Sequence, residues 1–215
     1  MRADVIKHLI SLEPASREFG WDRGTPIDRA YIQRFLESQK HHIKGHVLEE
    51  GDNRYGKLFA GERCLDGLVD WRVFRGDLTA HDSLPRSAAD CFICTQVFCC
   101  IHDLKRGIEG AMNVLRLGGT LLATVPCISP VSQYDATRWG YHWGIYPQAA
   151  LQAFGEVFGV ENVEISLYGN SLTATLYING LCLEECDLLE SELWTVDESY
   201  PVTIGIVATK TSNYA

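Results

Sequence analysis

The chain has 215 residues, of which 46% are hydrophobic and 22% are charged, and its formal net charge is −9. This size and composition predict one soluble globular domain that can bury a core without metals or disulfides. The acidic balance argues against a protein that binds the phosphate backbone of nucleic acids. No apolar run is long enough to span a bilayer, and residues 1–14 lack the pattern of a signal peptide, so we expect a cytoplasmic protein.

The eight cysteines do not have the spacing of a metal site. Cys91 and Cys94 fall on a predicted strand, where their side chains point to opposite faces. Cys99 and Cys100 are adjacent in the chain. Cys182 and Cys186 lie four residues apart, and no second pair of cysteines is spaced to complete a metal site with them. We therefore expect buried thiols in a reducing compartment and no bound metal.

The N-terminal part is predicted to be helical. A first helix is expected near residues 5–12, followed by a polar turn. Asp28 is expected to cap a second helix over residues 29–39. One face of this helix carries the apolar residues Tyr31, Ile32, Phe35 and Leu36.

Alternating strands and helices follow, which predicts a doubly wound, mostly parallel, seven-stranded α/β sheet. The first strands are expected near 46–50, 62–66, 71–75, 89–94 and 119–125, and helices near 53–60, 104–116 and 147–157. The last two strands are expected near 162–167 and 200–210. Residues 171–190 are mainly apolar and are interpreted as an added helix that packs on the sheet, with packing on a second subunit of a homodimer as the alternative.

Several recognisable segments occur in a specific order along this pattern. They are Asp22 to Arg29, Val47 to Asp52, Gly76 to Thr79, Asp90 to Gln96, Gly118-Gly119, and Tyr134-Asp135 with Arg138-Trp139-Gly140. With these segments, the sequence between about residues 17 and 210 resembles the class I S-adenosylmethionine-dependent methyltransferases. It is most similar to small methyltransferase-like proteins often found beside glycosyltransferases.

The resemblance implies one methyltransferase-like domain over residues 1–215, with S-adenosylmethionine as its cofactor. Residues 1–45 would form a helical cover, residues 46–126 the cofactor-binding half, and residues 127–215 the acceptor-side half. Ligands of open parallel sheets bind outside the carboxyl ends of the strands, and the polar residues of this chain fall at those ends.

The first turn would hold one end of the cofactor. Gly51 lets the backbone approach a ligand, and Glu49 could accept a hydrogen bond from the cofactor's ammonium group, as could Asp52 or Asn53. Tyr55 stands where other methyltransferases have glycine, although an acidic and aromatic turn is normal in the subgroup. The alternative is a polar turn in which Asp52 or Asn53 caps the next helix.

Later strand ends would hold the nucleoside. Asp66, with Asp70 as the alternative, is predicted to accept the ribose hydroxyls. By resemblance, Asp77 and the backbone of Leu78 would bind the adenine edge, although an aspartate-initiated turn also explains this segment. Thr95 and Gln96 would face the same ligand-binding edge.

Two segments are candidates for chemistry on the acceptor. His102 is the candidate general base, since imidazole titrates near neutrality, while a helix-start histidine without a catalytic role is the alternative. Asp103 would cap the helix that begins at Leu104. Five residues that follow the fifth strand are predicted to bind the acceptor or to close over the cofactor: Tyr134, Arg138, Trp139, His142 and Trp143.

These expectations favour methyl transfer to a small acceptor, such as a hydroxyl of a sugar or secondary metabolite in a biosynthetic route. The alternative is a protein of the same fold that does not methylate, either a cyclase-type enzyme or a non-catalytic partner of a glycosyltransferase. A nicotinamide dehydrogenase is disfavoured, because residues 51–56 lack the glycine pattern of a dinucleotide-binding turn.

Overall fold

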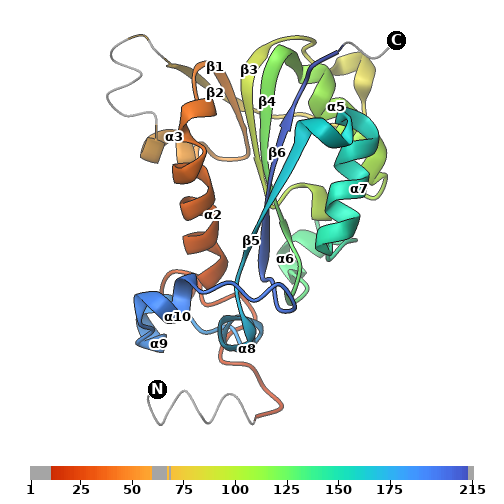
Figure 1. The fold of residues 1–215 in the computed structure, drawn as a ribbon. Coiled ribbons are helices and arrows are strands. Elements are labelled where there is room, and N and C mark those ends of the chain that lie inside the picture. The colour runs from red at the N-terminus through yellow and green to blue at the C-terminus, as the bar shows by residue number, and fades with distance from the viewer. Residues whose placement is uncertain (1–10, 60–66, 68, 213–215) are drawn as a thin grey trace.

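The computed structural model describes residues 11–59, 67 and 69–212 (Figure 1). Six strands form one sheet in the order β2-β1-β3-β4-β6-β5. The strands are β1 Gly45–Glu50, β2 Val69–Phe74, β3 Ala89–Thr95, β4 Leu115–Pro126, β5 Val163–Tyr168 and β6 Thr203–Thr209. The four strands β1 to β4 are mutually parallel, and β6 runs antiparallel to both of its neighbours.

This architecture confirms the α/β class and the mostly parallel sheet, with six strands in the described part of the chain instead of seven. The strand predicted near residues 62–66 lies outside the described residues. The strand beside β1 is β2, with Glu50 opposite Phe74. Arg75 to Asp77 therefore follow the strand that neighbours the first turn.

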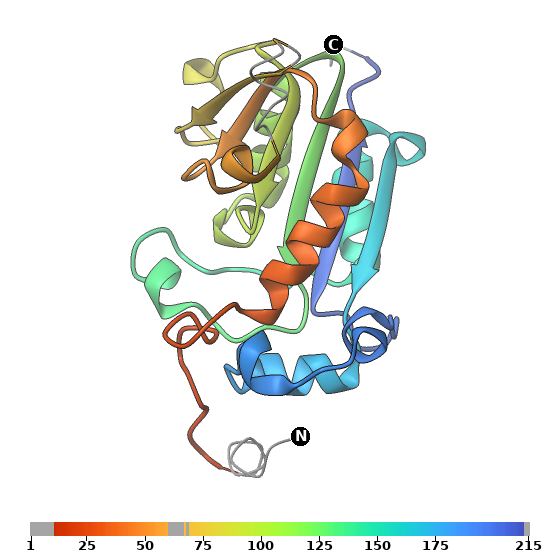
Figure 2. The same cartoon turned by 90° about the vertical axis from the view of Figure 1, so that its left-hand side faces the viewer.

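Helices cover both faces of the sheet (Figures 1 and 2). The main ones are α2 Ile27–Ser38 and α3 Arg54–Phe59 on one face, and α5 Leu104–Val114 and α7 Pro147–Phe158 on the other. The shorter ones are α6 Gln133–Ala136, α8 Ser171–Ile178, α9 Leu183–Cys186 and α10 Glu190–Trp194. The apolar stripe predicted for residues 29–39 is fully buried under α2.

The two predicted helix caps have different outcomes. Asp103 caps α5 as expected, because its side chain accepts a hydrogen bond from the Arg106 amide at 3.1 Å. Asp28 was expected to cap the second helix, and this prediction is wrong. The helix begins one residue earlier, at Ile27, behind Pro26, so Asp28 lies inside the first turn and makes no capping bond.

The Gly118-Gly119 segment also differs from the expected turn between a helix and a strand. α5 ends at Val114 and β4 begins at once, so both glycines lie within the strand. The β3–β4 register shifts between Ala89 and Cys91, which marks a bulge. Gly118 has a φ of 80°, a conformation that glycine adopts without a Cβ penalty, and this explains its place in the bulge.

The apolar segment near residues 171–190 folds into three short helices, where one added helix was expected. Residues of α8 pack within the chain against the start of α2, in a cluster that includes Ile27, Tyr31, Leu176 and Tyr177. Part of the apolar surface of this segment is therefore packed inside one subunit, while Ile178 stays exposed.

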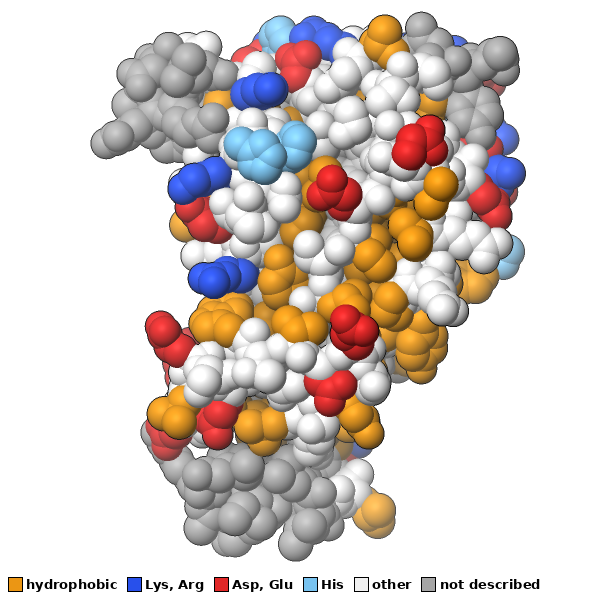
Figure 3. All heavy atoms as spheres, viewed as in Figure 1, with side chains coloured by type: hydrophobic (Ala, Val, Ile, Leu, Met, Phe, Trp, Pro, Cys, Tyr) orange, Lys and Arg blue, Asp and Glu red, His pale blue; other side chains and the backbone are white. Residues whose placement is uncertain are grey.

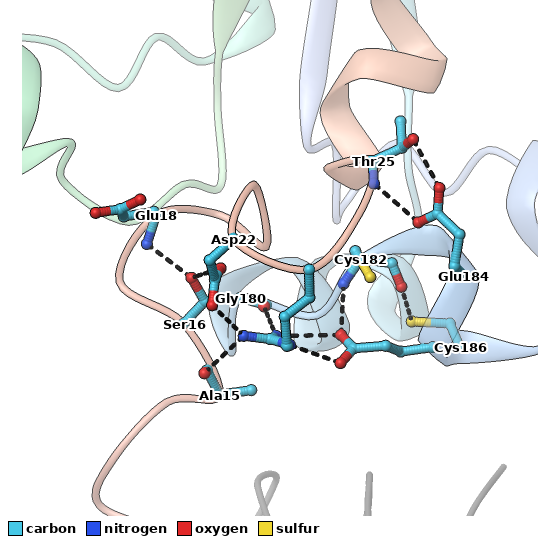
Figure 4. A network of polar contacts seen from close by, with 11 residues as sticks. Ala15, Ser16, Glu18, Asp22, Thr25, Gly180, Cys182, Glu184 and Cys186 are labelled. Carbon is cyan, nitrogen blue, oxygen red and sulfur yellow. Dashed lines mark hydrogen bonds and ion pairs between the residues drawn. The ribbon is translucent and has the colours of Figure 1, made fainter.

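A polar network joins this segment to the chain before α2 (Figure 4). Arg23 donates hydrogen bonds to the carbonyl oxygens of Ala15 and Gly180 and forms an ion pair with Glu185 at 2.6 Å. The Glu184 carboxylate accepts hydrogen bonds from the amide and hydroxyl of Thr25, both at 2.8 Å. These bonds fix both segments at the lower end of the sheet in Figures 1 and 2.

The face of the molecule seen in Figures 1 and 3 carries a band of apolar side chains. Figure 3 shows apolar side chains gathered between α2 and α7, where the edge strand β5 runs. Ile165 and Leu167 of β5 and Leu151 of α7 are partly buried there. Among the described residues, none of the helices is long and apolar enough to cross a membrane.

Candidate functional site

The turn after β1 is shaped by Glu49, whose carboxylate is buried beneath it. It accepts hydrogen bonds from the amides of Tyr55 and Gly56, at 2.9 and 2.8 Å, and from the Trp71 indole at 3.0 Å. Burial raises the pKa of Glu49, while these three donors lower it in part. Glu49 therefore anchors the start of α3 and makes no open acceptor in this structure.

Gly51 leaves the turn open toward solvent. Its φ is 108°, and a Cβ added at this position would meet no atom within 4 Å. Both properties suit a backbone that a ligand approaches closely. Asp52 is exposed and accepts a hydrogen bond from the Arg54 amide at 3.2 Å, which forms a polar turn leading into α3.

Tyr55 occupies the core instead of the ligand edge. Its side chain is 4% exposed and packs beside Phe59 in the cluster between α2 and the sheet. The ring that replaces the usual glycine of this turn is thus accommodated beneath α2. Its phenol oxygen is buried beside the guanidinium of Arg29.

Gln96 follows β3 and has the strongest signs of a functional position. Its φ is 59°, a left-handed conformation that costs energy for a residue with a side chain. The backbone amide of Gln96 donates to Thr124 at 2.9 Å, and its side-chain amide nitrogen is buried without a partner. β1 and β3 are neighbouring parallel strands, so Gln96 and the Gly51 turn share one edge of the sheet. Thr95, the last residue of β3, is half-buried beside it.

The structure describes some, but not all, of the residues predicted to bind the nucleoside. Asp77 accepts two hydrogen bonds from Thr79 through one oxygen, which lowers its pKa and forms the local turn foreseen as the alternative. Leu78 is buried against α5, where its carbonyl oxygen lies close to Gly110. Asp66 lies outside the described residues. Asp70 lies near the amino end of β2 and bonds His46 at 2.9 Å, on the edge opposite Gln96.

The structure brings His102 together with the loop that follows α6. The rings of His102 and His142 meet edge to face, with centroids 5.2 Å apart. The His142 amide donates to the carbonyl oxygen of Cys99 at 2.7 Å, and the Trp143 indole donates to that of Ile101 at 2.8 Å. The loop is therefore fixed to the segment after β3, and His102 lies at its border.

The remaining acceptor candidates form a separate group on α6 and just after it. The Arg138 guanidinium lies 3.6 Å from the centroid of the Tyr134 ring. Tyr134 and Trp139 are 65% and 67% exposed. No hydrogen bond, ion pair or ring contact joins these residues to His102 within the described part of the chain, so the five predicted acceptor residues divide into two groups.

Two sets of site-like residues were absent from the predicted set. Asp28 and Arg29 form a buried charged pair beside Tyr55. Asp28 has the helical spacing of Tyr31, Ile32 and Phe35, so it falls on the buried face, and this spacing could have revealed it. Glu50 is half-buried at the end of β1, and burial, then Asp52 and Glu49, raise its pKa.

The described residues contain no group of three or more histidine, cysteine, aspartate or glutamate residues that could hold a metal ion. Cavities occur away from the Gly51 and Gln96 edge. One of about 500 Å³ lies at the amino end of the sheet, bordered by His42, Lys44 and Asp90 among others.

Comparisons with known proteins give a result at the level of structure. Neither a search of protein-family models nor a search of curated proteins found a match. Among solved structures, a S-adenosylmethionine-dependent methyltransferase from Archaeoglobus fulgidus is similar, with 15% identity, a TM-score of 0.51, and coverage of 85% of this chain and 94% of that one.

Two further solved structures are similar to this chain at comparably low sequence identity. A protein from Thermotoga maritima, described as a possible histamine N-methyltransferase, has 14% identity and a TM-score of 0.50, covering 86% of this chain and 91% of that one. Phosphoethanolamine N-methyltransferase 2 from Haemonchus contortus, in complex with S-adenosylmethionine, has 11% identity and a TM-score of 0.52, covering 84% of this chain and 53% of that one. At these identities the similarity shows that the chain has the fold of class I S-adenosylmethionine-dependent methyltransferases.

Proposed function

We propose that this protein transfers a methyl group from S-adenosylmethionine to a small acceptor. The observation that carries the proposal is Gln96, a left-handed residue with an unpaired buried amide at the carboxyl edge of a methyltransferase-type sheet. Strained conformations and unpaired buried donors are costly, and they persist mainly where a ligand uses them. The neighbouring Gly51 turn leaves space for that ligand.

The residues at this edge fit the cofactor. Gly51 would let the backbone approach it, and the Gln96 amide would donate a hydrogen bond that the protein itself does not use. Asp77 follows the strand beside β1 and would accept a hydrogen bond from the nucleoside. When bound, the sulfonium supplies a methyl group that is intrinsically reactive.

The chain's own work is then to orient the acceptor and to remove its proton. The loop of His142 and Trp143 is held by hydrogen bonds to the segment Cys99 to Ile101, which follows Gln96 in the chain, and would border the acceptor. His102, at the border of the same loop, would act as the general base and take a proton from an acceptor hydroxyl. A sugar or secondary metabolite hydroxyl is the acceptor class we favour, given the aromatic side chains of this loop.

Calorimetric titration with S-adenosylmethionine and with S-adenosylhomocysteine tests the proposal. We expect micromolar binding of both, followed by release of S-adenosylhomocysteine when a panel of hydroxylated acceptors is added. His102→Ala should reduce turnover and leave the cofactor affinity nearly unchanged. Absence of binding at millimolar ligand, in protein shown to be folded by circular dichroism, would reject the proposal.

The second reading is a protein that binds the nucleoside without methylating. It is favoured by the first turn, where Asn53, Arg54 and Tyr55 replace the glycine-rich loop common in this fold. Micromolar binding with no acceptor-dependent turnover across the panel would support this reading, whether as a cyclase-type enzyme or as the partner of a glycosyltransferase.

A further inference from the structure

Two adjacent thiols lie in the segment between Gln96 and the proposed base. Cys99 and Cys100 belong to η3, a short 3-10 helix over Phe98–Cys100. Both cysteines are free, and their Sγ atoms lie 3.9 Å apart, so one thiol can donate a hydrogen bond to the other. The reaction proposed above uses neither sulfur atom.

The two thiols differ in access and in acidity. Cys99 is 1% exposed, whereas Cys100 is half-buried. The Cys99 thiol lies 3.2 Å from the Gln96 carbonyl oxygen, so it can donate either to this oxygen or to Cys100. Hydrogen bonding from Cys99 is the main cause that lowers the pKa of Cys100 and raises that of Cys99. Burial and the carboxylates of Asp135 and Glu50 oppose the effect on Cys100. Cys100 is therefore the thiol that ionises first and reacts first.

The backbone between the two thiols holds the loop that follows α6. The carbonyl oxygen of Cys99 accepts hydrogen bonds from the amides of His142 and Trp143, at 2.7 and 3.3 Å. This carbonyl belongs to the peptide group that joins Cys99 to Cys100. A movement of that one peptide group would therefore loosen the loop.

A bond between the two sulfur atoms requires such a movement. Disulfides usually join residues whose Cα atoms are roughly 4.4–6.8 Å apart, whereas consecutive Cα atoms lie about 3.8 Å apart. The two Sγ atoms must also come together from 3.9 Å. The small ring that closes contains the peptide group of Cys99, so its carbonyl cannot keep its present direction. A strained bond of this kind is also easily reduced again.

We infer that Cys100 is a site of thiol–disulfide exchange with a low-molecular-weight disulfide, that Cys99 is its resolving thiol, and that the bond formed between them releases the loop of His142 and Trp143. The inference rests on the proposed function in one respect: this loop borders the proposed acceptor. Oxidation would then switch off acceptor binding, and reduction would restore it.

The exchange has two steps. The Cys100 thiolate attacks one sulfur of the small disulfide, which leaves a mixed disulfide on Cys100 and releases one thiolate. Cys99 then loses its proton and attacks the Cys100 sulfur, which releases the second thiolate. The two protons of the protein thiols end on the two released thiols. Two electrons pass from the protein to the small disulfide, which is reduced.

Mass spectrometry after incubation with oxidised glutathione tests the chemistry. The wild type should lose two hydrogen atoms within the peptide that contains Cys99 and Cys100, and dithiothreitol should restore them. Cys99→Ser should stop at a glutathione adduct on Cys100, and Cys100→Ser should give neither product. Cys127→Ser removes another free thiol and should react as the wild type does.

Hydrogen exchange tests the effect on the loop. In oxidised wild type, a peptide covering residues 141–146 should exchange about 10-fold faster, the factor for the loss of one backbone hydrogen bond. Peptides from α7 should not change. Cys100→Ser treated in the same way should keep the slow exchange of the loop. The wild-type measurements do not depend on whether any variant folds.

Several results would overturn the inference: no reaction of the wild type, a lasting glutathione adduct on wild-type Cys100, a disulfide between other cysteines, or a closed bond with unchanged exchange of the loop. None of these measurements needs a cofactor or turnover. If the reduced protein binds no S-adenosylmethionine, the proposed function fails while the exchange chemistry can still be read. With an acceptor in hand, turnover should fall on oxidation and return with dithiothreitol.

Discussion

At the scale of single residues, the clearest signs of function are polar groups that the fold leaves unused. Gln96 combines a left-handed backbone with a buried amide that has no partner. A glycine would adopt this conformation more easily, and an apolar side chain would avoid the unpaired amide. The presence of glutamine therefore indicates a role for its side chain toward a ligand.

Two substitutions separate the backbone cost from the ligand role. Gln96→Gly relieves the strained conformation, and we expect its free energy of unfolding to rise by about 0.5–1 kcal/mol. Gln96→Ala keeps the strain and should not show this gain. Both variants lose the amide and should bind S-adenosylhomocysteine about 10-fold more weakly, which denaturant unfolding and calorimetry together would measure.

An unchanged affinity in both variants would remove Gln96 from the site. Ser87→Gly serves as the matched control, because Ser87 also has a left-handed φ of 49° but precedes β3; it should share the gain in stability and leave the affinity unchanged.

At the scale of elements, the sequence predicted what periodicity determines and missed what tertiary contacts determine. The strands β1, β3 and β5 and the helices α5 and α7 lie within two residues of their predicted bounds, because continuous apolar runs and helical spacing mark them directly. The sequence did not predict that β2 lies beside β1, because the order of strands in a sheet depends on how they pair in space.

The same reason explains two differences between the expected and the observed contacts. Aspartate is a favoured residue type for a helix cap. However, α2 begins at Ile27, so the carboxylate of Asp28 lies inside the first turn and is buried. Glu49 was expected to face the cofactor, yet its strand position places it under the amides of α3. Residue type suggested both roles, and only the register of each element could decide between them.

The contact between the chain before α2 and the α8–α9 segment gives an element-scale prediction. Its centre is the ion pair of Arg23 and Glu185, whose side chains are each 29% exposed. Hydrogen bonding to Arg23 is the main cause that lowers the pKa of Glu185 to about 2. Glu185→Gln should reduce the free energy of unfolding at pH 7 by about 1 kcal/mol, as for a partly exposed pair.

The pH dependence has a definite sign. Because the folded state holds the Glu185 pKa below its ordinary 4.5, the stabilisation is complete above pH 4.5 and is lost as the pH falls toward about 2. The difference between wild type and Glu185→Gln should therefore shrink across this window in urea unfolding. The exposed pair of Glu13 and Arg17 offers the control, since Glu13→Gln should show almost no effect at any pH. A constant difference from pH 7 to pH 2 would contradict the assignment.

At the scale of the whole molecule, segments from both ends of the chain meet at one edge of the sheet. The start of α2 and the α8–α10 segment lie side by side at the lower end of the molecule in Figures 1 and 2, where their apolar side chains form one cluster. The loop of His142 closes the same region from the middle of the sequence. A ligand at this edge would therefore contact elements that are far apart in sequence and stabilise them together.

Hydrogen exchange followed by mass spectrometry tests this arrangement. A ligand at 100 times its dissociation constant stabilises the folded state by about 2.7 kcal/mol, so exchange in the segments that it holds closed should slow by up to about 100-fold. We expect S-adenosylhomocysteine to protect residues 20–30, 50–57 and 95–102. The exchange rate of peptides from α7, Pro147–Phe158, should change least, because this helix packs on the opposite face of the sheet from α2. Protection concentrated at α7, or at the amino end of the sheet near His42, would place the ligand elsewhere and refute the site, since a ligand protects first the contacts that it makes itself.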